Sequence, residues 1–237
     1  MQWLESGAQK IGFALTPQQL QQFLCYQQEL LAWNRKFNLT AITEPADVEQ
    51  FHFLDSLSVA LALPDSVRAA GRLCDVGSGA GFPGVPLKLL LPGISLTLID
   101  STAKRTRFLS ALVAALGLEN VEVHTGRCED LAHDGLLRES FDAVVARAVA
   151  PLRVLAEYAL PFCRLGGCVV LQKKGDIQAE LAEAAQAWQE LGGGPPEVKP
   201  VPPEVLGGDR VLVVVEKVSG TPDRYPRRAG VPAKRPL

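Results

Sequence analysis

The sequence has 237 residues, of which 47% are hydrophobic, enough for one full core with a small appended lobe. Taken alone, its formal net charge of −2 argues against a nucleic-acid partner. No apolar run reaches the roughly 18 residues of a membrane-spanning helix. The first ten residues also lack the pattern of a signal peptide, so we expect a cytoplasmic protein that does not enter a membrane.

Cysteine and histidine usage predicts neither a disulfide framework nor a metal site. The five cysteines show no C-x-x-C spacing, and an odd number in a cytosolic chain indicates reduced, mostly buried thiols. A catalytic cysteine stays open as a weaker alternative. The three histidines are scattered along the chain, so we expect no metal.

Residues 1–66 are predicted to form a helical cap that has no core of its own. Thr16-Pro17 is typical of a helix start, and apolar residues follow at roughly helical spacing up to Leu31. A second helix is expected to begin after Pro45 and to end near Leu63.

From Arg72 the pattern alternates between strands and helices. The predicted strands are 72–76, 95–100, 121–125, 142–147 and 167–172, and the predicted helices are 84–91, 103–116, 151–160 and 177–191. Such alternation is typical of parallel βαβ units in a doubly wound α/β sheet. Two further extended runs, Val198–Val201 and Val211–Val218, predict a hairpin that adds an antiparallel strand at one edge. The Pro-rich, basic tail 219–237 is expected to be extended.

The glycine-rich stretch from Leu73 to Gly84 predicts a strand, a tight turn and a helix N-terminus that bind a nucleotide. A P-loop is excluded because Val85 stands where the phosphate-binding lysine would be. The segment from Gly79 to Gly84 matches G-x-G-x-x-G, a weak signal that leaves a dinucleotide open.

Acidic residues at three successive strand ends favour a different ligand. Asp75 precedes the glycines, Asp100 ends the next strand and is suited to a ribose diol, and Glu129 follows the third strand. Three carboxylates suit a ligand without phosphates and with positive charge, which fits S-adenosylmethionine. The alternative is that Asp75 and Asp100 cap a helix or turn and that Glu129 is a surface charge.

Several motifs together resemble the ribosomal small-subunit methyltransferase G family, also called glucose-inhibited division protein B. They are WNRKFNLTAI from Trp33, HFLDSL from His52, DVGSGAGFPGVPLK from Asp75, ARAVAPL from Ala146 and YPRRAGVPAKRPL from Tyr225. The resemblance covers nearly the whole chain. It implies a class I, Rossmann-like methyltransferase fold with a mostly parallel seven-stranded sheet, divided into the cap 1–66, a methyltransferase domain 67–218 and the tail 219–237.

The resemblance also implies the reaction and the site. The family methylates N7 of a guanine in 16S ribosomal RNA with S-adenosylmethionine, leaving S-adenosylhomocysteine. Carried over by position, Gly77 and Phe82 lie by the methionine part, Asp100, Ser101 and Thr102 by the ribose, Cys128 and Glu129 by the adenine, and Arg147 at the mouth of the site. Gly79 of the glycine loop is also expected to bind the cofactor.

Guanine N7 carries a lone pair and no proton, so we expect no general base and assign no catalytic residue. Arginine often binds guanine through O6 and N7 together, which would block the reacting atom. We therefore expect Arg147 to contact O6 or the cofactor carboxylate. The alternative is a structural ion pair between Arg147 and one of the strand-end acids.

The guanine must be unpaired or flipped out, because N7 lies in the deep major groove of A-form RNA. Candidate phosphate contacts are Lys104, Arg105, Lys173, Lys174 and the tail arginines. His52 and the pair Asp55-Ser56 are assigned to helix packing and capping in preference to substrate contact. We expect a monomer acting on small-subunit RNA, either naked or within the ribosomal particle.

Three other functions stay open on the sequence. One is a methyltransferase of small molecules or proteins with the same pocket. Another is a non-catalytic ribosome-assembly factor that keeps the pocket for stability. The third is a nicotinamide oxidoreductase, for which the sequence offers no proton-transfer residue.

Overall fold

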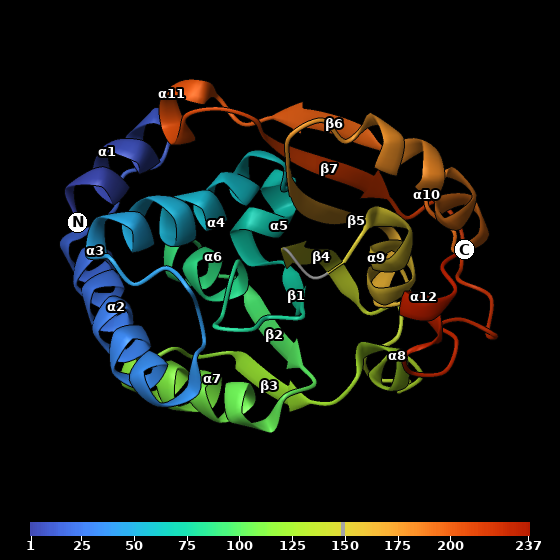
Figure 1. Ribbon diagram of the computed structural model, residues 1–237, viewed down its shortest axis with the longest axis horizontal. Helices are drawn as coiled ribbons and strands as arrows, with labels where there is room; N and C mark the ends of the chain where they lie inside the picture. The colour runs from blue at the N-terminus through green and yellow to red at the C-terminus, as the bar shows by residue number, and fades with distance from the viewer. Residues whose placement is uncertain (148–149) are drawn as a thin grey trace.

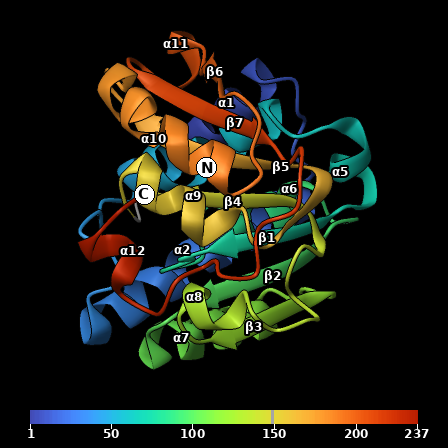
Figure 2. The same cartoon turned by 90° about the vertical axis from the view of Figure 1, so that its right-hand side faces the viewer.

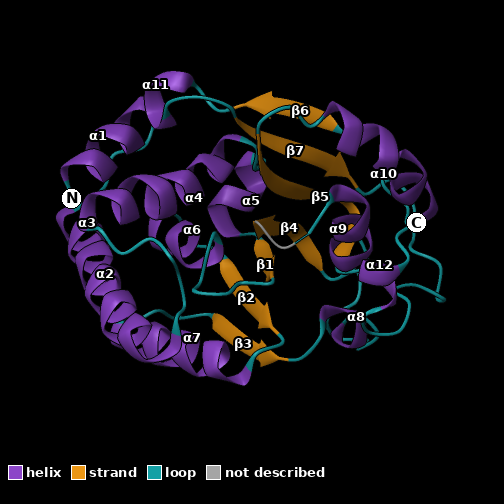
Figure 3. Ribbon diagram, in the orientation of Figure 1, coloured by secondary structure: helices purple, strands orange, loops and turns teal. Residues whose placement is uncertain are grey.

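A seven-stranded sheet runs through the middle of the molecule, with helices on both faces (Figure 1, Figure 3). The computed structural model describes residues 1–147 and 150–237. The strands follow the spatial order β3-β2-β1-β4-β5-β7-β6. Their bounds are β1 Arg72–Val76, β2 Ser95–Asp100, β3 Val121–Thr125, β4 Phe141–Arg147, β5 Cys163–Lys174, β6 Glu197–Pro200 and β7 Arg210–Glu216.

The predicted fold class is confirmed. Strands β3, β2, β1, β4 and β5 are parallel to one another, and β7 runs antiparallel to both β5 and β6. The predicted hairpin is present, with β7 next to β5 and β6 outermost. Strand β5 begins at Cys163, four residues before the predicted start at 167. The parallel strands all have their C-terminal ends on the same side of the sheet, so the loops that follow them lie close together there.

After Gly71, the longer helices lie between the strands where they were predicted. Several short helices were not predicted from the sequence pattern. The helices are α6 Gly84–Leu90, α7 Ala103–Ala115, α8 Cys128–Leu131, α9 Leu152–Ala159, α10 Gln178–Glu190, α11 Pro203–Leu206 and α12 Val231–Lys234. The motif ARAVAPL includes residues 148 and 149, which lie outside the described residues.

Both helices predicted for the cap are present, the second as an unbroken helical run over 45–61 that changes helix type along its length, and the cap has further helices at either end. It consists of α1 Gln2–Lys10, α2 Pro17–Phe37, α3 Pro45–Asp47, η1 Val48–Leu54, α4 Asp55–Leu57, η2 Ser58–Leu61 and α5 Asp65–Ala70. Helix α2 starts as predicted: the Thr16 hydroxyl accepts the Gln19 N–H, and the Gln19 side chain accepts the Thr16 N–H, which is a capping box. Helix α1 was not predicted.

The cap shares its core with one face of the sheet. Phe23, Tyr26 and Phe53 of the cap belong to the same buried cluster as Val85 of α6 and Leu98 of β2. The neighbouring strand residues face the other way, into a second cluster under α9 and α10. The division into cap, methyltransferase domain and tail stays a proposal.

The last segment, residues 219–237, contains the short helix α12 and lies along α8 and α9, whereas an extended tail was predicted (Figure 2). In the described part of the chain, no helix is both long and apolar enough to cross a membrane.

Candidate functional site

A cavity of about 370 Å³ opens where β1, β2 and β4 end. Eight of the nine predicted cofactor residues line it: Gly77, Gly79, Phe82, Asp100, Ser101, Cys128, Glu129 and Arg147. The ninth, Thr102, is not among the lining residues, and its N–H donates to Oδ1 of Asp100 at 2.8 Å. The structure therefore brings these residues together, and their role toward a cofactor stays a prediction. We call this space the first cavity.

The glycine loop presents bare backbone to the first cavity. Gly77 and Gly79 have φ values of 75° and 58°, in the left-handed region that favours glycine. The N–H groups of Gly77 and Ser78 both donate to the Ile99 carbonyl, at 2.8 and 3.0 Å, which ties the loop to β2. A Cβ at Gly79 would meet only the Gly77 carbonyl, at 3.8 Å, so the space beside it is open to a ligand.

Asp100 joins the glycine loop to the segment that follows β2. Its Oδ2 accepts the Gly79 N–H at 3.0 Å, and the Arg105 guanidinium lies 3.4 Å from the same oxygen. Its side chain is 4% exposed. Because a carboxylate offers about four lone-pair positions, it keeps capacity to accept ribose hydroxyls from the first cavity.

Asp75 does not belong to the site, which corrects the expectation that three acids face the cofactor. The side chain is fully buried, is not part of the lining, and accepts the Gly84 N–H at the start of α6 at 2.9 Å. Burial raises the pKa of Asp75 to about 7. The hydrogen bond from Gly84 and the charge of Arg147 lower the pKa, but by less than burial raises it. The alternative interpretation of Asp75 as a cap holds.

Glu129 and Cys128 form the far wall of the first cavity, at the start of α8. Glu129 is 1% exposed and accepts the Gly230 N–H at 2.8 Å and the Cys128 S–H at 3.3 Å. Burial, and then the charge of Glu129, raise the pKa of Cys128 well above its usual value. A thiol held in its protonated form is a poor nucleophile, which argues against a catalytic Cys128.

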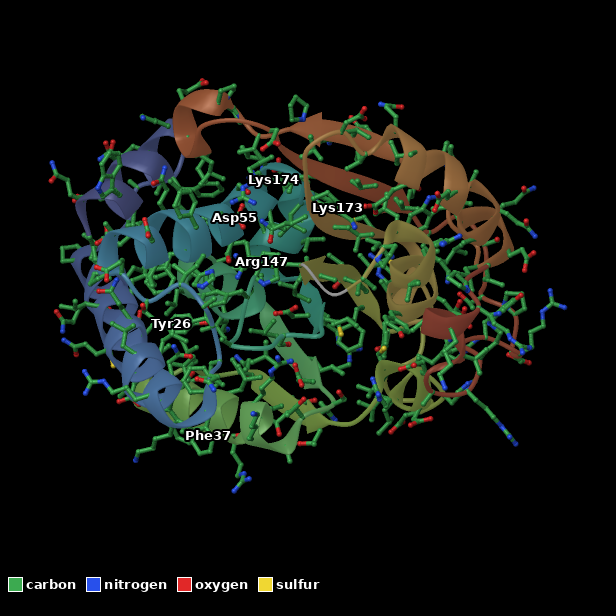
Figure 4. The ribbon with its side chains drawn as sticks, viewed as in Figure 1. Tyr26, Phe37, Asp55, Arg147, Lys173 and Lys174 are labelled. Carbon is green, nitrogen blue, oxygen red and sulfur yellow. The ribbon has the colours of Figure 1, made fainter. Side chains whose placement is uncertain are left out.

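Arg147 forms an ion pair with Asp55 of the cap. The alternative expectation, an ion pair between Arg147 and one of the strand-end acids, is therefore wrong. Nη1 of Arg147 donates to Oδ2 of Asp55 at 3.0 Å and to the Phe51 carbonyl at 3.2 Å. Its Nη2 lies 3.2 Å from Nδ1 of His52, and its guanidinium sits 4.7 Å from the centre of the Phe82 ring. Figure 4 shows Arg147 and Asp55 beside each other near the middle of the molecule.

The contacts of His52 define its protonation. A guanidinium only donates, so Nδ1 of His52 accepts from Arg147, and the proton is on Nε2, which lies 2.8 Å from the Thr40 hydroxyl. Burial and the Arg147 charge lower the pKa of His52 to about 4. His52 is therefore a neutral ring that holds Arg147 and the loop at Thr40.

Phe82 is the centre of an aromatic cluster between the cap and the glycine loop. The rings of His52 and Tyr26 stack on it with centroids 4.5 and 5.4 Å away. The Tyr26 hydroxyl donates to the Ala80 carbonyl at 2.5 Å. The cap thus sets the position of the loop that lines the first cavity.

A second cavity, of about 540 Å³, shares His52 and Arg147 with the first. Lys173, Lys174 and Arg210 give it cationic walls, and Asp55 is its acid, 3.4 Å from Arg210. Figure 4 shows Lys173 and Lys174 on the side of Arg147 toward β5. A phosphate-bearing ligand suits this second cavity, next to a first cavity with two carboxylates.

The other predicted phosphate contacts have different surroundings. Arg105 is at the first cavity with Asp100, and Lys104 is exposed on α7. In the tail, Arg227 forms an ion pair with buried Glu157, and Arg224 lies 4.0 Å from Glu190.

Several cavity residues were not predicted from the sequence. Thr40, Tyr158 and Arg127 line the first cavity, and His52 lines both cavities although it was assigned to packing. Thr40 and His52 lie within the motifs WNRKFNLTAI and HFLDSL, and this position was the sequence signal that could have identified them as site residues.

Residues 19–202 match the family model described as rRNA small subunit methyltransferase G. The chain belongs to the rRNA small subunit methyltransferase G family. Proteins named ribosomal RNA small subunit methyltransferase G are 48% identical in Dehalococcoides mccartyi, over all of both chains, and 46% identical in Lactobacillus johnsonii, over 96% of this chain and 95% of the relative.

Solved structures agree on the fold. A SAM-dependent methyltransferase from Aquifex aeolicus superposes with a TM-score of 0.56 at 18% identity, covering 79% of this chain and 98% of that one. A predicted O-methyltransferase from Agrobacterium tumefaciens gives 0.53 at 22% identity, covering 70% and 80%. The predicted family and enzyme class, an S-adenosylmethionine-dependent methyltransferase, are confirmed.

Proposed function

We propose that this enzyme transfers a methyl group from S-adenosylmethionine to N7 of a guanine in 16S ribosomal RNA. The family membership supports the small-subunit RNA as substrate. The observation that carries the proposal is the pair of adjoining cavities, which meet at Arg147 and His52. One has carboxylates and bare glycine backbone, and the other has cationic walls.

The first cavity has the groups that S-adenosylmethionine needs. Asp100 would accept the ribose hydroxyls, the α8 wall at Cys128 and Glu129 would border the adenine, and Gly77, Gly79 and Phe82 would border the methionine part, with Ser101 beside the ribose. When bound, the cofactor supplies a methyl group on a positively charged sulfur. The residues present fit this group, because a Cβ-free loop and two buried carboxylates face it.

Attack by N7 on the methyl group needs no base, and we assign none. N7 has an in-plane lone pair and carries no proton, and His52 at the junction is neutral and already hydrogen-bonded on both ring nitrogens. The protein therefore acts by aligning the guanine with the methyl group and by excluding water.

Arg147 is held so that it would orient the guanine. The contacts given above use three of its five N–H groups, on Asp55, Phe51 and His52. Within residues 1–147 and 150–237 the other donors have no protein partner, and we assign them to O6 of the guanine or to the cofactor carboxylate. A fixed guanidinium that binds O6 alone leaves N7 open to the methyl group.

The second cavity would take the flipped guanosine and its phosphates. Lys174 and Arg210 line this space, and an unpaired or flipped base is required because N7 is out of reach in A-form RNA. We take the enzyme to act as a monomer, and naked RNA and the ribosomal particle are the two substrate forms to compare.

The test is transfer of labelled methyl from S-adenosylmethionine to RNA from cells that lack this protein, followed by nucleoside analysis. We expect the label in small-subunit RNA as 7-methylguanosine. Cofactor binding without label in naked RNA or in particles would overturn the proposal and favour a non-catalytic assembly factor. Thermal stabilisation by NAD and not by S-adenosylhomocysteine would favour an oxidoreductase.

A further inference from the structure

The C-terminal segment, residues 219–237, is held by acidic residues of the methyltransferase domain. The Thr221 N–H donates to Glu139 at 2.7 Å, and the Tyr225 hydroxyl donates to Glu190 at 2.6 Å. Two further contacts reach elements that carry the wall of the first cavity. Figures 1 and 2 both place α12 beside α8 and α9.

The first of these contacts joins the segment to α9. Glu157 has a fully buried side chain, and Arg227 binds both of its oxygens, with Nε at 3.0 and 3.1 Å and Nη2 at 2.6 Å. The Arg227 backbone N–H donates to the same carboxylate at 2.7 Å. The next residue of α9, Tyr158, lines the first cavity.

The second contact joins the segment to α8. The Gly230 N–H donates to Oε1 of Glu129 at 2.8 Å, and Glu129 is 1% exposed at the adenine side of the first cavity. Gly230 has a φ of 81°, a conformation that favours glycine, and it is the residue before α12. The other oxygen of Glu129 accepts the Cys128 S–H, so the contact fixes the rotation of the carboxylate.

We propose that Arg227 and the Gly230 N–H make the C-terminal segment a positioning element of the cofactor site. Arg227 fixes α9 behind Tyr158, and Gly230 fixes the Glu129 carboxylate, so this segment sets the shape of the adenosine wall. The proposal rests on the proposed function of the first cavity as the cofactor site. It also reassigns Arg227: its guanidinium neutralises Glu157 and is not a contact to RNA phosphate.

The test measures the affinity for S-adenosylhomocysteine by titration calorimetry, with Arg227→Ala as the first variant. Loss of a charged hydrogen bond behind the wall should raise the Kd about tenfold, or about 1.4 kcal/mol. The KM for S-adenosylmethionine should rise while kcat at saturating cofactor stays close to that of the natural enzyme. Arg227→Lys, which keeps the charge, should restore part of the affinity.

A matched control removes tail charge without these contacts. Arg228, Lys234 and Arg235 are exposed, and the triple alanine variant should bind S-adenosylhomocysteine as the natural chain does. A second variant lacking residues 229–237 keeps the Arg227–Glu157 pair and loses the Gly230 N–H, so it decides the matter if Arg227→Ala fails to fold.

The outcomes separate the two proposals. If the natural chain does not bind S-adenosylhomocysteine, the proposed cofactor site is wrong. If it binds, and folded Arg227→Ala and the truncated chain bind equally well, the positioning role is wrong. A reduced salt dependence of RNA binding in Arg227→Ala, with unchanged cofactor affinity, would return Arg227 to RNA contact.

Discussion

Arg147 and Asp55 form an ion pair of 3.0 Å between the end of β4 and the cap helix α4. Their side chains are 15% and 6% exposed, and Arg210 of β7 lies 3.4 Å from the other Asp55 oxygen. One carboxylate thus pairs with two guanidinium groups at the second cavity. The cap is therefore part of the site as well as a cover for the sheet.

Asp55→Asn removes that negative charge at nearly constant size. The two arginines then repel each other in a poorly solvated place, and we expect a loss of stability on the order of 3 kcal/mol. Misplacement of Arg147 should lower the rate of methyl transfer on the order of 100-fold. Urea unfolding and single-turnover transfer measure the two effects.

Arg164→Ala serves as the control for Asp55→Asn. It breaks the exposed Arg164–Asp142 pair, which is 2.6 Å long and lies outside both cavities, so stability should change by about 1 kcal/mol or less. A full transfer rate in folded Asp55→Asn would restrict Asp55 to helix packing and capping, as predicted from the sequence.

Tyr26→Phe tests whether the cap positions the glycine loop. The variant loses the hydrogen bond to the Ala80 carbonyl in a fully buried place, which should cost about 1 to 3 kcal/mol of stability. S-adenosylhomocysteine should bind more weakly, because the loop at Gly79 loses its support. Gln22→Ala on the same helix removes a bond to the Leu116 carbonyl and should leave the affinity unchanged. Equal affinities in the two variants would contradict the role of Tyr26.

The sheet and the glycine loop could be predicted because their signals are local. Strands β1, β2 and β3 have the predicted bounds, since short apolar runs alternate with helical segments. The positions of Gly77, Gly79 and Asp100 at strand ends follow from parallel topology alone. Helices of four residues, such as α8 and α12, carry too little periodicity to be seen.

Contacts between residues that are far apart in the chain could not be predicted from the sequence. Arg147 and Asp55 are 92 residues apart, and Gly230 and Glu129 are 101 apart. Two tail arginines, Arg224 and Arg227, likewise lie beside Glu190 and Glu157, which are distant from them in the chain, so the sequence did not predict these pairs. Asp75 was misassigned for a related reason: its orientation depends on the Gly84 N–H, which spacing does not reveal.

Lys174→Ala should weaken RNA binding and reduce its salt slope by about one. Lys174 lines the second cavity, and within residues 1–147 and 150–237 no acid lies within ion-pair distance of it. Its neighbour Lys173 is 2.7 Å from Glu180, so Lys173→Ala should change the slope less. Titrations at several salt concentrations measure both, with Lys199→Ala on β6 as the control.

If Lys173→Ala and Lys174→Ala reduce the salt slope of RNA binding equally, the ion pair with Glu180 does not prevent Lys173 from contacting RNA. An unchanged slope in Lys174→Ala would mean that the phosphates do not enter the second cavity. Binding of S-adenosylhomocysteine should be unchanged in Lys174→Ala, because Lys174 does not line the first cavity.

His52 should make stability depend on pH between about 4 and 6.5. Burial and Arg147 lower the pKa of the folded His52 to about 4 from its ordinary value of 6.5. In this range the unfolded chain binds more protons, so this contribution is complete above pH 6.5 and is lost as pH falls to 4. Its size is on the order of 3 kcal/mol.

Asp75 makes stability depend on pH in the opposite direction. Its pKa in the folded protein is raised to about 7, so its contribution to stability is lost as pH rises. The measurement is therefore urea unfolding of the natural chain and two variants at pH 5 and pH 7. His52→Gln should gain less stability than the natural chain between pH 5 and 7, and Asp75→Asn should gain more. Parallel pH dependence in His52→Gln and the natural chain would mean that folding does not lower the pKa of His52, and burial of a neutral ring beside Arg147 would be wrong.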